Sequence, residues 1–66
     1  MNITVNGSPR TTAEASSVAQ LLDELGFSAK PVVVELNRVA IFARDYATTT
    51  IPENAQIEIV VLAAGG

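Results

Sequence analysis

The first five residues alternate between apolar and polar side chains, which is the period-two pattern of a strand with one buried face. The apolar ones are Met1, Ile3 and Val5. Asn6 and Gly7 follow, and this dipeptide is a strong hairpin signal because both residues tolerate the positive φ angles of a type I′ turn. The pattern predicts a hairpin whose second strand covers residues 8–13, with Pro9 marking an edge strand.

A short amphipathic helix is predicted from Ser17 to Leu25. Ser17 and Gln20 have the spacing of a capping box, in which each side chain bonds the other residue's backbone N–H. Apolar residues at helical spacing form one stripe, made of Val18, Leu21, Leu22 and Leu25. Gly26 supplies the left-handed residue that ends a helix, and Phe27 falls where a Schellman motif places its hydrophobic contact. We expect the stripe to pack on the sheet.

A second hairpin and a final strand follow the helix, and the expected strands cover residues 32–37, 39–42 and 56–62. The hairpin turns at Asn37 and Arg38, whereas residues 43–55 are polar and turn-like. This order predicts an α+β fold with a mixed four- to five-stranded sheet and one helix packed on one face. We divide the chain into a domain over residues 1–62 and a flexible tail over residues 63–66.

Composition narrows the possible chemistry. The chain has no Cys, His or Trp, which excludes disulfides, thiolate metal sites and imidazole bases. Apolar residues make up 48% of the chain, enough for it to fold. The net charge is −3 and the few cations are scattered, so we expect no nucleic-acid partner. The longest apolar run is far shorter than the roughly 20 residues of a membrane helix, and we expect a soluble, cytoplasmic protein with no membrane association.

Few side chains are suited to catalysis. The serines and threonines have no imidazole to activate them. Asp23 and Glu24 are neighbours whose side chains diverge on a helix, so we expect a solvated face rather than an acid and base pair. Thr48–Thr50 has the composition of an ordinary loop.

The chain end is the strongest candidate for chemistry. Gly65 and Gly66 lack a Cβ atom, so the last peptide unit can pass through a narrow slit. Residues 63–66 reach about 14 Å when fully extended. A carboxylate is a poor acyl electrophile, and its use requires ATP and a separate enzyme that makes an acyl-adenylate. The activated Gly66 carbonyl can then accept sulfur or be attacked by an amine.

A resemblance to a known family covers the whole chain and is carried by residues 18–27, 34–37, 41–46, 57–60 and 64–66. These segments resemble the ThiS family, ubiquitin-like sulfur carriers of thiamin biosynthesis. Three positions depart from the family's pattern. Ala43 stands where many members have Pro, Tyr46 where many have Trp, and Asn54-Ala55 where many have an Asp-Gly turn. None of these departures touches the tail.

The resemblance implies a β-grasp (ubiquitin-like) fold and a carrier rather than an enzyme. A ThiF-like adenylyltransferase would use ATP to adenylate Gly66, and a cysteine desulfurase-derived donor would deliver sulfur. Thiazole synthase (ThiG-like) would then consume the thiocarboxylate. The carrier would bind no cofactor or metal of its own and would be monomeric when free.

A carrier of this kind must insert its tail into two successive enzymes. Ala64 and Gly65 would then thread with Gly66 into each active site. On the last strand, Val60 and Leu62 point to the face opposite the buried one. We therefore expect both residues to contact partners.

Three other functions stay open. The small subunit of molybdopterin synthase has a similar fold and tail, although it is usually longer and often carries Pro before its Gly-Gly. A ubiquitin-like modifier would be joined through Gly66 to lysines of target proteins. A plain interaction domain would have an inert tail.

Overall fold

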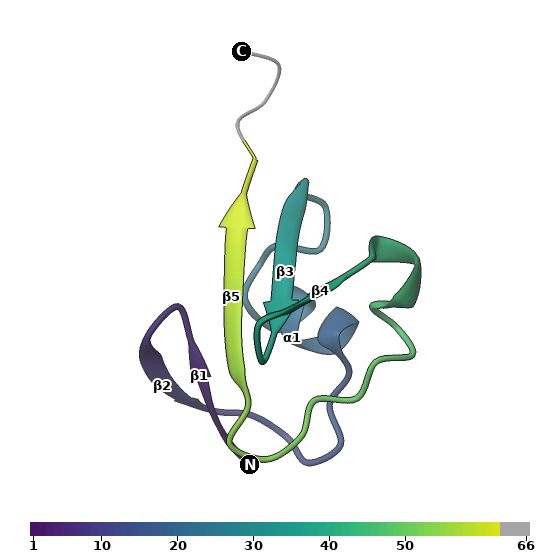
Figure 1. Cartoon of the computed structure of the whole chain (residues 1–66). Helices are drawn as coiled ribbons and strands as arrows, with labels where there is room; N and C mark the ends of the chain where they lie inside the picture. Colours follow the sequence, from purple (N-terminus) through teal and green to yellow (C-terminus); the bar gives the residue numbers. More distant parts are fainter. Residues whose placement is uncertain (63–66) are drawn as a thin grey trace.

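The computed structural model describes residues 1–62, which form a mixed sheet with one helix across one face (Figure 1). The elements are β1 (Asn2–Val5), β2 (Ser8–Thr11), α1 (Val18–Glu24), β3 (Val32–Leu36), β4 (Val39–Ile41), the 3₁₀ helix η1 (Ala43–Asp45) and β5 (Gln56–Val61). The strands lie in the order β2-β1-β5-β3-β4. β5 is parallel to β1 and antiparallel to β3. The predicted α+β, β-grasp architecture is confirmed, with β2 at an edge as Pro9 suggested.

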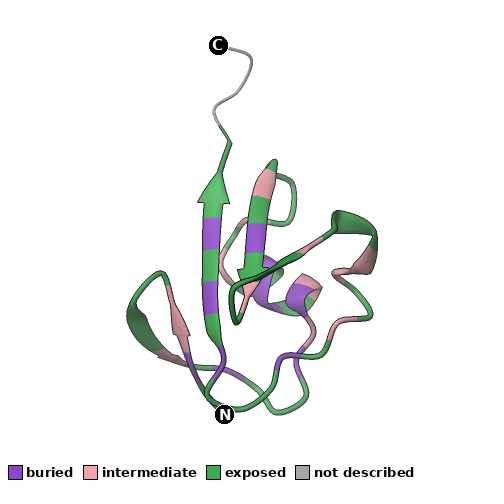
Figure 2. Cartoon of the chain, viewed as in Figure 1, coloured by how far each residue is buried: buried purple, intermediate pink, exposed green. Residues whose placement is uncertain are grey.

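The core lies between the sheet and α1. It consists of Ile3, Val18, Leu21, Leu22, Val34, Ile51, Ala55, Ile57 and Ile59. Buried and exposed positions alternate along β5 up to Val60 (Figure 2). Such alternation is typical of a strand with one covered face. The other face of β3 and β5 is therefore available to solvent.

Both ends of α1 are closed by the local motifs that the sequence predicts. The Ser17 hydroxyl accepts a hydrogen bond from the Gln20 N–H at 3.1 Å, and the Gln20 side chain accepts one from the Ser17 N–H at 2.8 Å. At the other end Gly26 has a φ of +81°. The Phe27 N–H donates to the Leu22 carbonyl at 2.8 Å, which is the bond that defines a Schellman motif.

The two hairpins turn through left-handed residues. Asn6 and Gly7 have φ angles of 49° and 81°, and Asn37 and Arg38 have φ angles of 49° and 69°. Two consecutive positive φ angles are the mark of a type I′ turn. Asn and Gly adopt this conformation readily, whereas Arg38 places a Cβ atom where it crowds the following carbonyl. The β3–β4 turn is therefore strained at one residue.

The segment over residues 43–55 is more structured than its composition indicates. It contains η1, and Ser17 and Thr50 form an isolated antiparallel bridge. Ile51 and Ala55 are each only 1% exposed and belong to the core. The Tyr46 hydroxyl donates to the Val32 carbonyl at 3.3 Å, which ties the segment to the start of β3.

Glu24 is exposed, as expected of a solvated acidic face, and it also makes two contacts at the end of α1. Its carboxylate accepts a hydrogen bond from the Thr12 hydroxyl at 2.7 Å and lies 3.8 Å from the Arg10 guanidinium. These contacts join the end of the helix to β2 and the residue that follows it. Asp23 is exposed, as expected.

Candidate functional site

The candidate site is the end of β5 and the open face of the sheet beside it. β5 leads into residues 63–66 (Figure 1). Ala64, Gly65 and Gly66 lie outside the described residues, so the roles assigned to them stay predictions. What the structure describes is the surface from which this chain end departs.

Val60 and Leu62 lie on the face that α1 does not cover. Val60 is 58% exposed and Leu62 is 48% exposed, whereas Ile57 and Ile59 point into the core. The Leu62 N–H donates to the Pro31 carbonyl at 2.9 Å, so pairing with the β3 side continues beyond the last residue of β5. The backbone of both residues is therefore paired with the β3 side, and both side chains are exposed.

Val33 extends this surface onto β3. It lies directly opposite Val60 in the β3–β5 register and is 44% exposed. Val33, Val60 and Leu62 together form what we name the outer apolar patch. The sequence pattern does not single out Val33, because the run of three valines at 32–34 does not show which of them faces the core. The alternation around buried Val34, once the strand is defined, identifies it.

Two asparagine side chains hold β5 in the sheet where its neighbours end. The Asn6 amide donates to the Ile59 carbonyl at 3.1 Å and accepts from the Ile59 N–H at 2.8 Å, as a backbone peptide unit of a longer β1 would. At the other end Asn37 donates its N–H to the Gln56 carbonyl at 2.7 Å and accepts from the Gln56 N–H at 2.8 Å through Oδ1. These bonds extend the pairing of β5 at Ile59 on one side and at Gln56 on the other.

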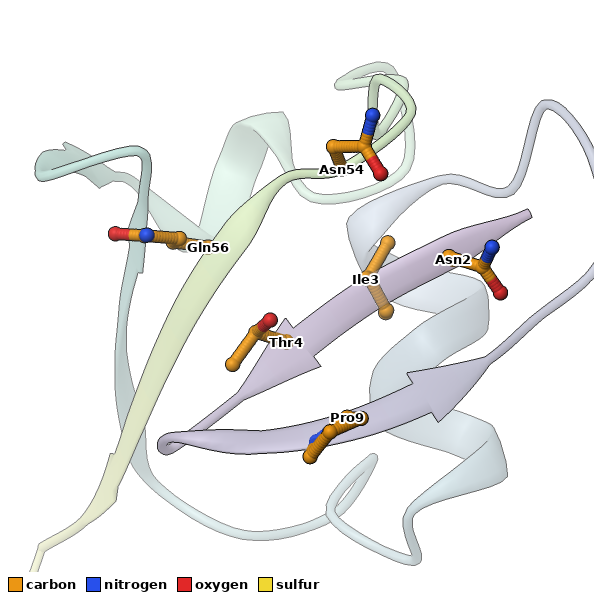
Figure 3. A pocket seen from close by; sticks show the side chains of 6 residues that line it. All are labelled: Asn2, Ile3, Thr4, Pro9, Asn54 and Gln56. Atoms are coloured by element: carbon orange, nitrogen blue, oxygen red, sulfur yellow. The ribbon is translucent and has the colours of Figure 1, made fainter.

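A shallow hollow of about 220 Å³ lies beside β1 and the start of β5 (Figure 3). It is lined by Asn2, Ile3, Thr4, Pro9, Asn54 and Gln56. None of these side chains is ionisable in the physiological range, so the hollow holds no general acid or base. It also lies at the end of β5 farther from residues 63–66. The hollow offers no catalytic site.

Residues 1–62 can also be considered for a metal site and for a membrane-spanning helix. Within residues 1–62, no three His, Cys, Asp or Glu side chains come close enough together to hold a metal ion. No helix among the described residues has the length and apolar character needed to span a membrane.

Comparison with known proteins shows the family of the chain. The sequence matches the ThiS family over residues 3–66, which includes the terminal glycines. The chain belongs to the ThiS family. The resemblance drawn from its motifs is thus confirmed, and the departures at Ala43, Tyr46 and Asn54-Ala55 do not remove it from the family.

Solved ThiS structures share the fold over the whole chain. The crystal structure of the thiamine biosynthesis protein (ThiS) from Geobacter metallireducens is 36% identical, has a TM-score of 0.85 and is matched over 100% of both chains. A solution NMR structure of a thiamine biosynthesis protein from the same organism is 35% identical with a TM-score of 0.82. It matches all of this chain and 88% of that one.

Two curated sequences are also similar over the full 66 residues. One is the thiazole synthase of Magnetococcus marinus, which is 33% identical and of which this ThiS-family chain spans 20%. The other is the uncharacterized protein ycf40 of Porphyra purpurea, which is 29% identical and of which the chain spans 93%. The chain thus covers only about a fifth of the length of the first relative.

Proposed function

We propose that this chain is a sulfur carrier in thiamin biosynthesis. Its Gly66 carboxylate is adenylated by a ThiF-like enzyme, converted to a thiocarboxylate and used by thiazole synthase (ThiG-like) as the sulfur source. The observation that carries the proposal is the ThiS family match, which extends through Gly66. The likeness to a solved thiamine biosynthesis protein over the whole chain supports it.

The proposed chemistry takes place at one carbonyl carbon. A Gly66 carboxylate oxygen attacks the α-phosphorus of ATP, and pyrophosphate leaves. A persulfide made from cysteine by a desulfurase then attacks the acyl-adenylate, and AMP leaves. A second thiol cleaves the resulting acyl disulfide, which frees the thiocarboxylate and leaves a disulfide on the donor side. The carrier supplies the acyl group, and its partners supply the catalytic side chains.

The described domain contributes a firm base and a docking surface. Asn6 and Asn37 hold β5 in the centre of the sheet, so the tail starts from a defined position. Val60 and Leu62 are exposed next to that position, and the proposed role of both is to contact the enzymes that receive the tail. Ala64 has only a methyl side chain and Gly65 has none, which suits a narrow active-site channel.

The similarity to a thiazole synthase supports the last step. A protein of that name contains a stretch that is 33% identical to the whole of this chain. A sulfur carrier delivers its sulfur directly to the enzyme that consumes it. A carrier-like segment within a thiazole synthase is consistent with such a direct transfer. The proposed partner of the loaded carrier is accordingly a thiazole synthase.

The test is the intact mass of the protein after incubation with ATP, the host's ThiF-like enzyme, a cysteine desulfurase and cysteine. We expect one oxygen to be replaced by sulfur, and fragmentation to place the change at Gly66. A variant that lacks Gly66 is the control and should keep its mass. An unchanged mass of the complete chain, with the enzyme active on another carrier, would refute the proposal. Gly66-dependent conjugates to other proteins would instead indicate a modifier.

A further inference from the structure

Two glutamates face each other on the open side of the sheet. Glu35 on β3 and Glu58 on β5 are direct partners in the register, and both are exposed. Each is flanked along its strand by residues that point into the core, such as Val34 and Ile57. The two carboxylates therefore project from the same surface, with Cβ atoms about 5 Å apart as in any directly opposed pair.

This arrangement is unfavourable in the free protein, because like charges directly opposite each other destabilise a sheet. No ion pair within residues 1–62 includes either glutamate. Three of the four basic side chains are engaged elsewhere: Arg10 lies near Glu24, Arg44 near Asp45 and the Phe42 ring, and Lys30 over the Phe27 ring. Arg38 is exposed in the β3–β4 turn and has no ion pair among the described residues. No ion pair among the described residues therefore offsets the negative charge of the two glutamates.

The acidic pair adjoins the outer apolar patch. Val33 and Val60 form the second register pair further along the same strands, on the same face. Two residues of a strand span roughly 7 Å. Leu62 continues the apolar surface toward residues 63–66. A partner that covers the patch and reaches the tail thus also lies close to the two carboxylates.

We propose that Glu35 and Glu58 together bind one Lys or Arg side chain of the enzyme that adenylates this chain. Apolar side chains around that cation cover Val33, Val60 and Leu62. The spacing of the carboxylates allows a single guanidinium or ammonium group to bond both, and charge-assisted bonds of this kind are stronger than neutral ones. The assignment rests on the proposed function and specifies the chemistry of the partner's surface.

The test compares the free carrier and its reaction with the adenylating enzyme for Glu35→Gln, Glu58→Gln and the double variant. In the free protein, removal of one charge relieves the repulsion, so the thermal midpoint should rise. With the enzyme, the KM for the carrier should increase by roughly two- to fivefold for each single variant. A higher thermal midpoint together with a higher KM would indicate that the glutamates recognise the partner, because a purely structural role would not raise both.

Asp23→Asn is the matched control. Asp23 is exposed on α1, on the other side of the sheet, and its replacement changes the net charge by the same amount. Its KM should equal that of the parent chain. Added salt should raise the KM of the parent and of Asp23→Asn, but that of the double glutamine variant much less.

Two results would overturn the proposal. The glutamine variants could keep the parent's KM and its salt dependence, or Asp23→Asn could raise the KM as much as they do, which would indicate a general charge effect. Failure of the proposed function is separate from both. It would appear as a parent chain that is not adenylated at all by an enzyme active on another carrier.

Discussion

Replacement of Arg38 by glycine should stabilise the protein. Arg38 has a φ of 69° in the β3–β4 turn, and a left-handed conformation costs a residue with a Cβ atom roughly 1–2 kcal/mol. Glycine removes that cost but adds unfolded-state entropy of about 0.5–1 kcal/mol. The Arg38 side chain is exposed and forms no ion pair within residues 1–62. The net expectation is a gain of about 0.5–1 kcal/mol.

The neighbouring residue provides a control in the same turn. Asn37 also has a positive φ, but Asn tolerates this conformation and its Oδ1 accepts the Gln56 N–H. Asn37→Gly relieves little strain and removes a hydrogen bond worth about 0.5–1.5 kcal/mol. It should therefore destabilise the protein, although both changes introduce glycine one residue apart.

Thermal and urea unfolding followed by circular dichroism would measure both variants. For a domain of this size, 1 kcal/mol shifts the melting temperature by roughly 4–8 °C. We expect the midpoint to rise for Arg38→Gly and to fall for Asn37→Gly, with an unchanged urea m-value for both. An Arg38→Gly protein that is no more stable than the parent would refute the strain argument. An Asn37→Gly protein as stable as the parent would refute the role given to the Asn37 side chain.

Three further predictions concern the core, the tail and the docking surface. Leu22→Ala should destabilise the domain by about 2–5 kcal/mol by opening a cavity under α1, and a thermal melt equal to the parent's would contradict the assignment of Leu22 to the core. Deletion of Gly66 should abolish sulfur incorporation and leave the circular dichroism spectrum unchanged; a changed spectrum would show that the chain end supports the fold. Val60→Asp should raise the KM with the adenylating enzyme at least tenfold, or about 1.4 kcal/mol, while the thermal midpoint stays close to the parent's. An unaffected KM would remove Val60 from the docking surface.

Local motifs are the part of this fold that the sequence predicts well. The Asn6-Gly7 turn, the capping box at Ser17 and the Schellman motif at Gly26 each depend on residues within a few positions of one another. Their geometry follows from the φ preferences and hydrogen-bonding groups of those residues alone. The structure confirms all three.

Contacts between distant segments could not be predicted in the same way. The sequence pattern places Asn6 only in a turn, yet its side chain bonds the backbone of Ile59, 53 positions away. The burial of Ile51 and Ala55 has no periodic signal, since the surrounding residues are polar and form no regular strand. The pairing of Glu35 with Glu58 depends on the register of β3 and β5, which a strand pattern does not specify by itself. The exposed face of β5 was predictable from its alternation, but the neighbours on that face were not.

The central position of β5 has a mechanical consequence. An enzyme that draws residues 63–66 into a channel pulls on β5 along its own axis. β5 is bonded to β3 on one side and to β1 and the Asn6 amide on the other. The force therefore loads both rows of hydrogen bonds in shear, whereas an edge strand pulled in the same direction is held by one row only. In the proposed function, the pull of the enzyme thus acts on the strand that is bonded on both sides.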